Sequence, residues 1–278
     1  MTSTIASLMA GLLIGAASCA QESAAPAAAP PATQPTTQPA TAPAVDPAVR
    51  KILDQLEQAG EEYSSITADL DYQVDDRMTG DTEVRAGAVK YKKETAKTPA
   101  KFYVRFDTLK QGQGKTFREK LEYGFDGQYL TVARHRLKQM IRYQAAAKGE
   151  KIDPFRLGRG PFPLPFRQKA DDLIKYFAVE NRRLGEKDPK NADRIRLTTR
   201  KEYKEEINFL TLEMWVDRDS HLPVKIRTTD KDEKTRTVNF SKIKTDVKLA
   251  DTVFHMKRPG LDWEYHVRTL EEGKVPTP

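Results

Sequence analysis

The spacing of apolar residues changes early in the chain from a helical period to a period of two. Between Val49 and Leu56, apolar residues recur at the i, i+3, i+4 and i+7 positions of one helix face. Asp46 and Pro47 precede this run, as an N-cap acid and a first-turn proline do at many helix starts. Apolar and polar residues then alternate over 66–74. The pattern predicts an amphipathic helix leading into a strand with one buried face.

Further strand-like segments follow, separated by turn signals. They are 84–94, 101–107, 117–125, 128–133, 138–143, 194–198, 207–217, 222–229, 235–243 and 263–269. Asp126-Gly127 is a hairpin signal between two of them. A short helix is predicted over 170–177. Because the strands follow one another with short turns, the pattern favours an antiparallel meander over alternating strands and helices.

The segment 207–217 is apolar on both sides of the predicted strand. One face carries Leu210, Leu212, Met214 and Val216, and the other carries Ile207, Phe209 and Trp215. A strand that is apolar on both faces is covered on both. We therefore expect one face to pack on helices and the other on a second layer or an apolar ligand.

The segment 153–166 interleaves four prolines with large apolar residues. Proline at this density is incompatible with a central strand or a helix interior. The apolar side chains of this segment still require a covering partner.

The chain begins with an apolar run over 5–17 that contains no charged residue. A membrane-spanning helix needs roughly 20 apolar residues, so this run instead suits the core of a signal peptide. Small residues lead into Cys19, as in a bacterial lipoprotein signal, although Ala16 stands where leucine is usual. We expect Cys19 to be acylated. The alternative is ordinary secretion, with Cys19 left as a free thiol or removed with the signal.

The segment after Cys19 consists almost wholly of Ala, Pro, Thr and Gln up to Val45. It has too little apolar surface to offset the entropy of ordering and is predicted to be an extended tether. The expected organisation is a signal peptide over 1–18, a disordered tether over 19–45 and one large domain over 46–278.

The chain carries 47 Lys and Arg against 40 Asp and Glu, a net charge of +7. A basic balance fits nucleic acid or anionic lipid as a partner. Here, however, basic residues alternate with acidic ones, which favours a solvated sheet face. The export signal also argues against nucleic acid. With a single cysteine, the chain has no internal disulfide.

No catalytic, metal-binding or cofactor-binding motif stands out. The segment 112–116 (GQGKT) resembles the end of a phosphate-binding loop, but Leu109 occupies the position of the required first glycine. The four histidines lack the spacing of a metal site, and no GxSxG motif occurs. We therefore predict a protein that is not an enzyme and has no cofactor. An enzyme would need polar residues that meet only in the fold.

Several segments resemble the LolA/LolB family of lipoprotein carriers. The first helix and strand, up to Val74, are similar to the family's N-terminal elements. The segment 123–130 (YGFDGQYL) resembles its "DG..LW.Y" hairpin. The segment 214–226 resembles its "WiD...lPvki" hairpin, and 240–260 resembles its closing strand and Pro-Gly. Together these stretches span most of the predicted domain.

The resemblance implies an α+β fold, in which an open, strongly curved antiparallel sheet forms a half-barrel with helices over its concave face. In this family, the space between sheet and helices holds acyl chains. The implied wall residues are Phe102, Val104, Phe106, Leu210, Leu212, Met214 and Trp215. The implied lid residues are Leu157, Phe162, Leu164 and Phe166. Plain core packing is the alternative role for each wall residue.

We therefore expect a non-catalytic lipoprotein on the periplasmic side of a bacterial envelope, anchored by its N-terminal lipid, that binds acyl chains or lipoproteins. Ala20 follows the cysteine, in place of the Asp that retains lipoproteins at the inner membrane, which favours the outer membrane. The alternative is a regulatory or scaffolding module of the RseB type that binds a membrane protein partner.

Overall fold

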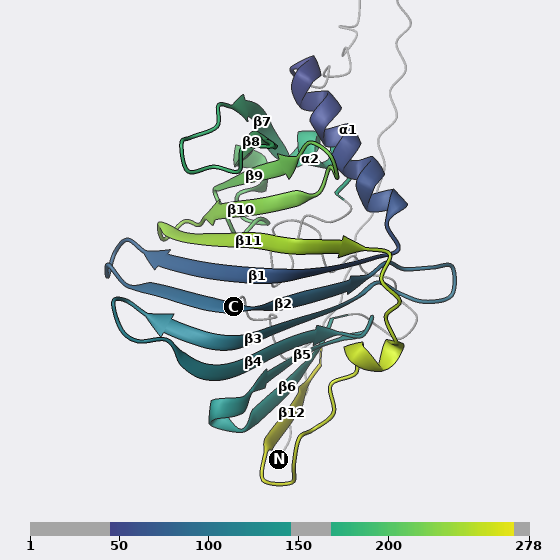
Figure 1. The fold of residues 1–278 in the computed structure, drawn as a ribbon, viewed down its shortest axis with the longest axis vertical. Helices are drawn as coiled ribbons and strands as arrows, with labels where there is room; N and C mark the ends of the chain where they lie inside the picture. The colour runs from purple at the N-terminus through teal and green to yellow at the C-terminus, as the bar shows by residue number, and fades with distance from the viewer. Residues whose placement is uncertain (1–44, 146–167, 270–278) are drawn as a thin grey trace, which may run out of the picture. The chain divides into compact units, whose positions relative to one another are not determined.

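The computed structural model describes residues 45–145 and 168–269, which all belong to one compact unit spanning 42–278 (Figure 1). The predicted signal peptide, Cys19 and all of the predicted tether except Val45 lie outside the described residues. The four lid candidates, Leu157, Phe162, Leu164 and Phe166, also lie outside them. Val45 is half-buried and packs against the core, so the described residues begin one residue before the predicted domain.

The described strands form one curved, unclosed sheet of twelve (Figure 1). They are β1 (Ser65–Asp76), β2 (Thr82–Lys92), β3 (Lys101–Gln111), β4 (Phe117–Phe125), β5 (Tyr129–Arg134), β6 (Gln139–Gln144), β7 (Phe177–Arg182), β8 (Ala192–Thr199), β9 (Thr211–Asp217), β10 (Pro223–Thr229), β11 (Lys234–Thr245) and β12 (Glu264–Arg268). Their order across the sheet is β12-β6-β5-β4-β3-β2-β1-β11-β10-β9-β8-β7. The predicted open, curved antiparallel sheet is confirmed.

Three details of the strand predictions are wrong. β7 was not predicted, because only half of its residues are apolar and its pairing with β8 stabilises it. β9 begins at Thr211 rather than at residue 207, although Ile207 and Phe209 are buried ahead of it. β12 pairs in parallel with β6, far away in sequence, and so departs from the expected meander. Long-range pairing of this kind leaves no local sequence signal.

Two α-helices, α1 (Pro47–Glu62) and α2 (Ala170–Tyr176), confirm the predicted helical segments. The Asp46 carboxylate accepts a hydrogen bond from the Ala48 amide at 2.8 Å, which caps the first turn of α1. Arg50 of α1 pairs with Asp171 of α2 at 2.7 Å. Both helices also contact β7. Neither helix has the length and apolar character that crossing a bilayer requires.

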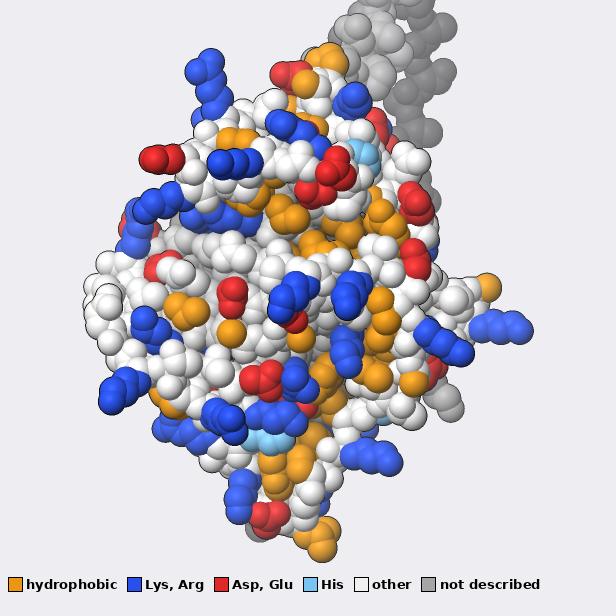
Figure 2. Space-filling model, viewed as in Figure 1, with side chains coloured by type: hydrophobic (Ala, Val, Ile, Leu, Met, Phe, Trp, Pro, Cys, Tyr) orange, Lys and Arg blue, Asp and Glu red, His pale blue; other side chains and the backbone are white. Residues whose placement is uncertain are grey.

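The two faces of the sheet differ in what covers them. We call inner the face whose side chains form the main hydrophobic cluster with α1 and α2, and outer the opposite face. A smaller cluster, formed by Ala133, Met140 and Trp263, joins the C-terminal segment to the outer face. Figure 2 shows Lys and Arg side chains spread over the face in view, with Asp and Glu side chains among them.

Candidate ligand-binding site

A cavity of about 630 Å³ opens on the inner face, at the end of the sheet where β1 turns into β2 and β3 turns into β4. This volume lies within the range of small-molecule binding sites. The lining residues are Tyr72, Val74, Asp76, Asp81, Thr82, Glu83, Arg85, Phe106, Gln111, Gly112, Leu121, Tyr123, Arg134, Lys234 and Arg236. They come from β1 to β5, from β11 and from the two turns, so neighbouring strands of the curved sheet build the cavity.

Aromatic side chains form the apolar wall of this cavity. The ring centroids of Tyr72 and Phe106 lie 5.7 Å apart, and those of Phe106 and Tyr123 lie 6.5 Å apart in an edge-to-face arrangement. Val74 and Leu121 add half-buried aliphatic surface. Burial raises the pKa of Tyr72 to about 12 and that of Tyr123 to about 12, so both phenols stay neutral at physiological pH. The wall is therefore uncharged.

Charged side chains from β2 and β11 complete the lining. Arg85 contacts Glu83 at 2.5 Å, and Arg236 contacts Asp230 at 2.6 Å. Each arginine also keeps a buried nitrogen, Arg85 Nη1 and Arg236 Nε, without a hydrogen-bond partner among the described residues. Both arginines line the cavity, so an acceptor oxygen on a ligand would meet their positive charge there. The cavity is thus amphipathic, with a neutral aromatic wall beside charged side chains that include Arg85 and Arg236.

Most of the predicted wall residues lie together on the inner face, but most of them belong to the packed core and do not line the cavity. Phe102, Val104, Phe106, Leu212 and Met214 are all buried in the main cluster on the inner face. Of these five, Phe106 also lines the cavity. Leu210 is half-buried just before β9. Trp215 lies on the outer face, with Arg194 4.9 Å and Lys225 4.3 Å from its ring centroid, and is separated from the five residues of the inner cluster.

Several residues that line the cavity were not predicted as site residues. Tyr72 was identified only as a buried position of the first strand. Arg85 and Arg236 gave no signal, because single arginines in alternating strands look like solvent-facing positions. Only the strand register brings them together, with Tyr72 opposite Arg85 and Val74 opposite Arg236.

A separate polar cluster lies on the outer face around Glu122. Its carboxylate accepts a hydrogen bond from the Tyr103 hydroxyl, contacts His135 Nε2, and pairs with Lys120 at 3.1 Å. Burial acts to raise the pKa of Glu122, but the bonds from Tyr103, His135 and Lys120 outweigh it and hold the pKa below its usual value. The contacts keep Glu122 ionised and link β3, β4 and the turn after β5.

The Glu122 cluster predicts an acid-sensitive contribution to stability. Because the folded-state pKa of Glu122 is depressed, its contribution is present above the unfolded pKa of about 4.3 and lost as pH falls through the folded pKa. At pH 6, Glu122→Gln is expected to lower the free energy of unfolding by about 1.5 kcal/mol. Urea titrations should show that the difference in the free energy of unfolding between the wild-type chain and Glu122→Gln becomes smaller towards pH 3.

The control for this experiment is Glu186→Gln, in the exposed loop after β7. It should change the free energy of unfolding by less than about 0.5 kcal/mol at every pH. A deficit for Glu122→Gln that stays constant from pH 6 to pH 3 would contradict the prediction.

Comparisons with known proteins place the chain by fold. No model of a known protein family matches the chain, and no curated protein matches it either. Solved structures with a similar fold include lipoprotein LppX from Mycobacterium tuberculosis, 12% identical, with a TM-score of 0.44 over 74% of this chain and 100% of that chain. A LolA superfamily protein from Nitrosomonas europaea is 12% identical, with a TM-score of 0.33 over 75% and 97% of the two chains.

A chain of the MucA/MucB complex from Pseudomonas aeruginosa is also similar, with 16% identity and a TM-score of 0.39 over 76% of this chain and 61% of that chain. These solved structures include a LolA superfamily protein, and the predicted resemblance to the LolA/LolB family is a likeness of fold. At these identities and TM-scores, the likeness supports no statement about ligand or activity.

Proposed function

We propose that this chain is a non-catalytic protein of the bacterial cell envelope that binds acyl chains, free or attached to lipoproteins, on the inner face of its sheet. The observation that carries the proposal is the amphipathic cavity, in which neutral aromatic walls lie beside arginine donors. Such a lining matches a molecule with an apolar chain and an ester, amide or acid group.

The energetics of this binding follow from the two kinds of lining. Each methylene that leaves water for the aromatic wall contributes about 0.8 kcal/mol. An acceptor oxygen near Arg85 or Arg236 would gain a charge-assisted hydrogen bond from a residue that lines the cavity. The apolar chain supplies most of the affinity, and the arginines orient the polar end.

The N-terminal sequence supports a location in the envelope. An acylated Cys19 followed by a tether would hold the domain near a membrane, with the outer membrane favoured by Ala20. LppX, one of the similar structures, is itself a lipoprotein. An anchored chain would act as a local receptor or holder of acyl chains, whereas cleavage after Cys19 would make it a free carrier.

The cavity can be tested by filling it. Leu121→Arg places a long cation beside Phe106, and Val74→Trp fills the same space without adding charge. Either change is expected to lower the amount of acyl lipid bound per protein by about tenfold. Native mass spectrometry and lipid extraction of the purified full chain measure this amount.

Leu137→Arg is the matched control for Leu121→Arg, because Leu137 is 63% exposed and does not line the cavity. It should leave lipid binding unchanged. A wild-type chain that repeatedly purifies without lipid and takes up none from vesicles would overturn the proposal, as would equal loss in both arginine variants.

The second candidate function is a regulatory module that binds a membrane protein partner. The specific observation in its favour is edge strand β12, whose five residues are all exposed. An exposed edge can accept a strand from a partner. MucB, one of the neighbours by fold, forms a complex with MucA. Capture of a defined envelope protein that persists in Leu121→Arg and is lost in Val267→Pro would favour this function.

A further inference from the structure

A second hollow, of about 500 Å³, lies where β7 ends and β8 begins, and four arginines dominate its lining. Arg182 and Arg183 come from the end of β7 and the loop after it, Arg194 from β8, and Arg218 from the turn after β9. Asp193 is the one carboxylate among the lining residues. The lining therefore has three more positive charges than negative ones. The hollow shares no residue with the cavity on the inner face.

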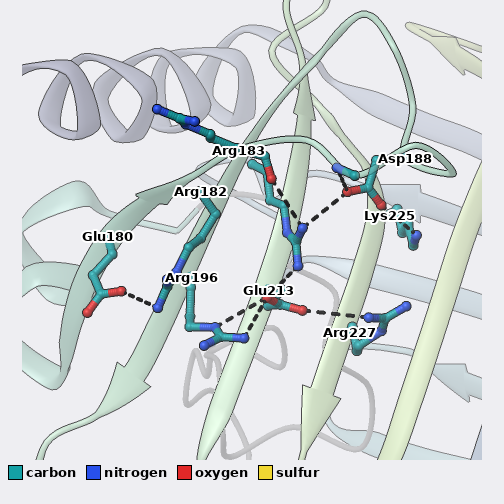
Figure 3. A network of polar contacts seen from close by, with 10 residues as sticks. Glu180, Arg182, Arg183, Asp188, Arg196, Glu213, Lys225 and Arg227 are labelled. Carbon is teal, nitrogen blue, oxygen red and sulfur yellow. Dashed lines mark hydrogen bonds and ion pairs between the residues drawn. The ribbon is translucent and has the colours of Figure 1, made fainter.

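Two of these arginines are already paired, Arg182 with Glu180 at 2.6 Å and Arg218 with Asp193 at 2.8 Å, whereas Arg183 is not paired within the described residues. The Arg183 guanidinium pairs with no carboxylate of the described residues, and Figure 3 shows it pointing away from the labelled acids. Only its backbone oxygen takes part, accepting a hydrogen bond from Arg194 Nη1 at 3.2 Å. Arg194 Nε is buried and has no partner within 45–145 and 168–269.

Neighbouring contacts hold the floor of the hollow rigid. Arg194 donates to Glu213 at 2.8 Å and pairs with Asp188 at 3.3 Å. Its guanidinium also stacks over Trp215, 4.9 Å from the ring centroid. Asp188 and Glu213 are nearly buried, so their charge is held below the surface while Arg182 and Arg183 remain exposed. Arg182, Arg183 and Arg218 outnumber the exposed Glu180 and the partly exposed Asp193, so the exposed charge at this corner is net positive.

We infer that this hollow binds a phosphate-bearing anion. Guanidinium groups match phosphate oxygens with paired hydrogen bonds, and several arginines around one hollow fit a group that carries one or two negative charges. The phosphate could belong to a lipid headgroup or to a soluble molecule.

The test uses the full chain carrying Cys19→Ala, so that no lipid anchor contributes to binding. One arm titrates inorganic phosphate and sn-glycerol 3-phosphate at constant ionic strength by calorimetry. The other arm measures flotation with vesicles of phosphatidylcholine alone or mixed with phosphatidylglycerol. The paired change Arg182→Ser and Arg183→Ser removes two exposed guanidiniums and leaves Arg194 and its network in place.

The expected result is saturable binding in at least one arm that falls about tenfold in the Arg182→Ser, Arg183→Ser chain. Loss in the vesicle arm alone assigns a lipid headgroup, and loss in the soluble arm assigns a free phosphate compound. The matched control is Arg105→Ser with Arg136→Ser, two exposed arginines at a distant part of the sheet with the same change in net charge.

Two outcomes would overturn the inference. One is the absence of saturable phosphate binding together with equal vesicle binding by the wild-type and the Arg182→Ser, Arg183→Ser chains. The other is an equal loss in the control pair, which would show that overall charge alone attracts anions. Because the cavity is untouched by these changes, acyl-lipid binding should persist, so failure here is distinguishable from failure of the proposed function.

Discussion

Replacing Glu213 with alanine is expected to lower the free energy of unfolding by about 3 kcal/mol, because it leaves a group of arginines without their shared carboxylate. Glu213 contacts Arg194 at 2.8 Å, Arg196 at 3.0 Å and Arg227 at 3.8 Å, and its side chain is only 7% exposed (Figure 3). Burial opposes ionisation, but Arg194 and Arg196 hold the pKa of Glu213 below its usual value. This loss of stability is at the lower end of the range for breaking a buried ion pair, because Arg196 and Arg227 are partly exposed to solvent.

Urea denaturation measures this effect as a lower midpoint with an unchanged slope. Glu180→Ala is the matched control on the same face, because Glu180 is 54% exposed and pairs with Arg182 at 2.6 Å. It is expected to cost about 0.5 kcal/mol. Similar losses for Glu180→Ala and Glu213→Ala would show that burial of the Glu213 carboxylate does not contribute as described.

Replacing Phe102 with alanine is expected to lower the free energy of unfolding by about 4 kcal/mol. Phe102 is 1% exposed, and its ring stacks on Phe125 with centroids 5.8 Å apart. The alanine variant therefore leaves a void inside close-packed surroundings. In Leu121→Ala, by contrast, the truncated side chain borders an existing cavity, and we expect a loss of about 1 kcal/mol.

Comparing Phe102→Ala with Leu121→Ala distinguishes a residue of the packed core from a residue that lines the cavity. Equal losses in urea denaturation would contradict the prediction and would mean that the open space extends along the inner face to Phe102. Lipid extraction from the same proteins provides an independent reading. Phe102→Ala should retain bound lipid in the folded fraction, because Phe102 does not line the cavity.

The local sequence pattern was enough to predict the first helix, the first strand and the turn at Asp126-Gly127. The helical spacing after Asp46 matches α1, and the cap at its start is present as expected. The Asp126 carboxylate accepts from the amides of Gln128 and Tyr129, which closes the predicted turn. Such features depend on residues a few positions apart, so their physical cause lies within a short window of sequence.

The edge strands and the residues of the cavity could not be predicted in this way, because they depend on pairing between strands that are distant in sequence. β7 is mostly exposed, yet it extends the sheet because β8 supplies its hydrogen bonds. The sequence placed Trp215 on a second apolar face of its strand. In the structure, its ring lies on the outer face beneath Arg194 of β8 and beneath Lys225 and Arg227 of β10. Sequence alternation assigns residues to a face, and it does not tell which neighbours cover that face.

The sequence by itself determined the succession of one helix, many antiparallel strands and a second helix, and it predicted export and a lipid anchor at Cys19. Tertiary structure alone decided which side chains meet. Arg85 and Arg236 reach the aromatic wall of the cavity, and Arg183 and Arg218 share a hollow, only through strand register and sheet curvature. The period of apolar residues indicates which positions of one strand or helix are buried. A binding site, by contrast, is formed by strands that are distant in sequence and adjacent in the sheet.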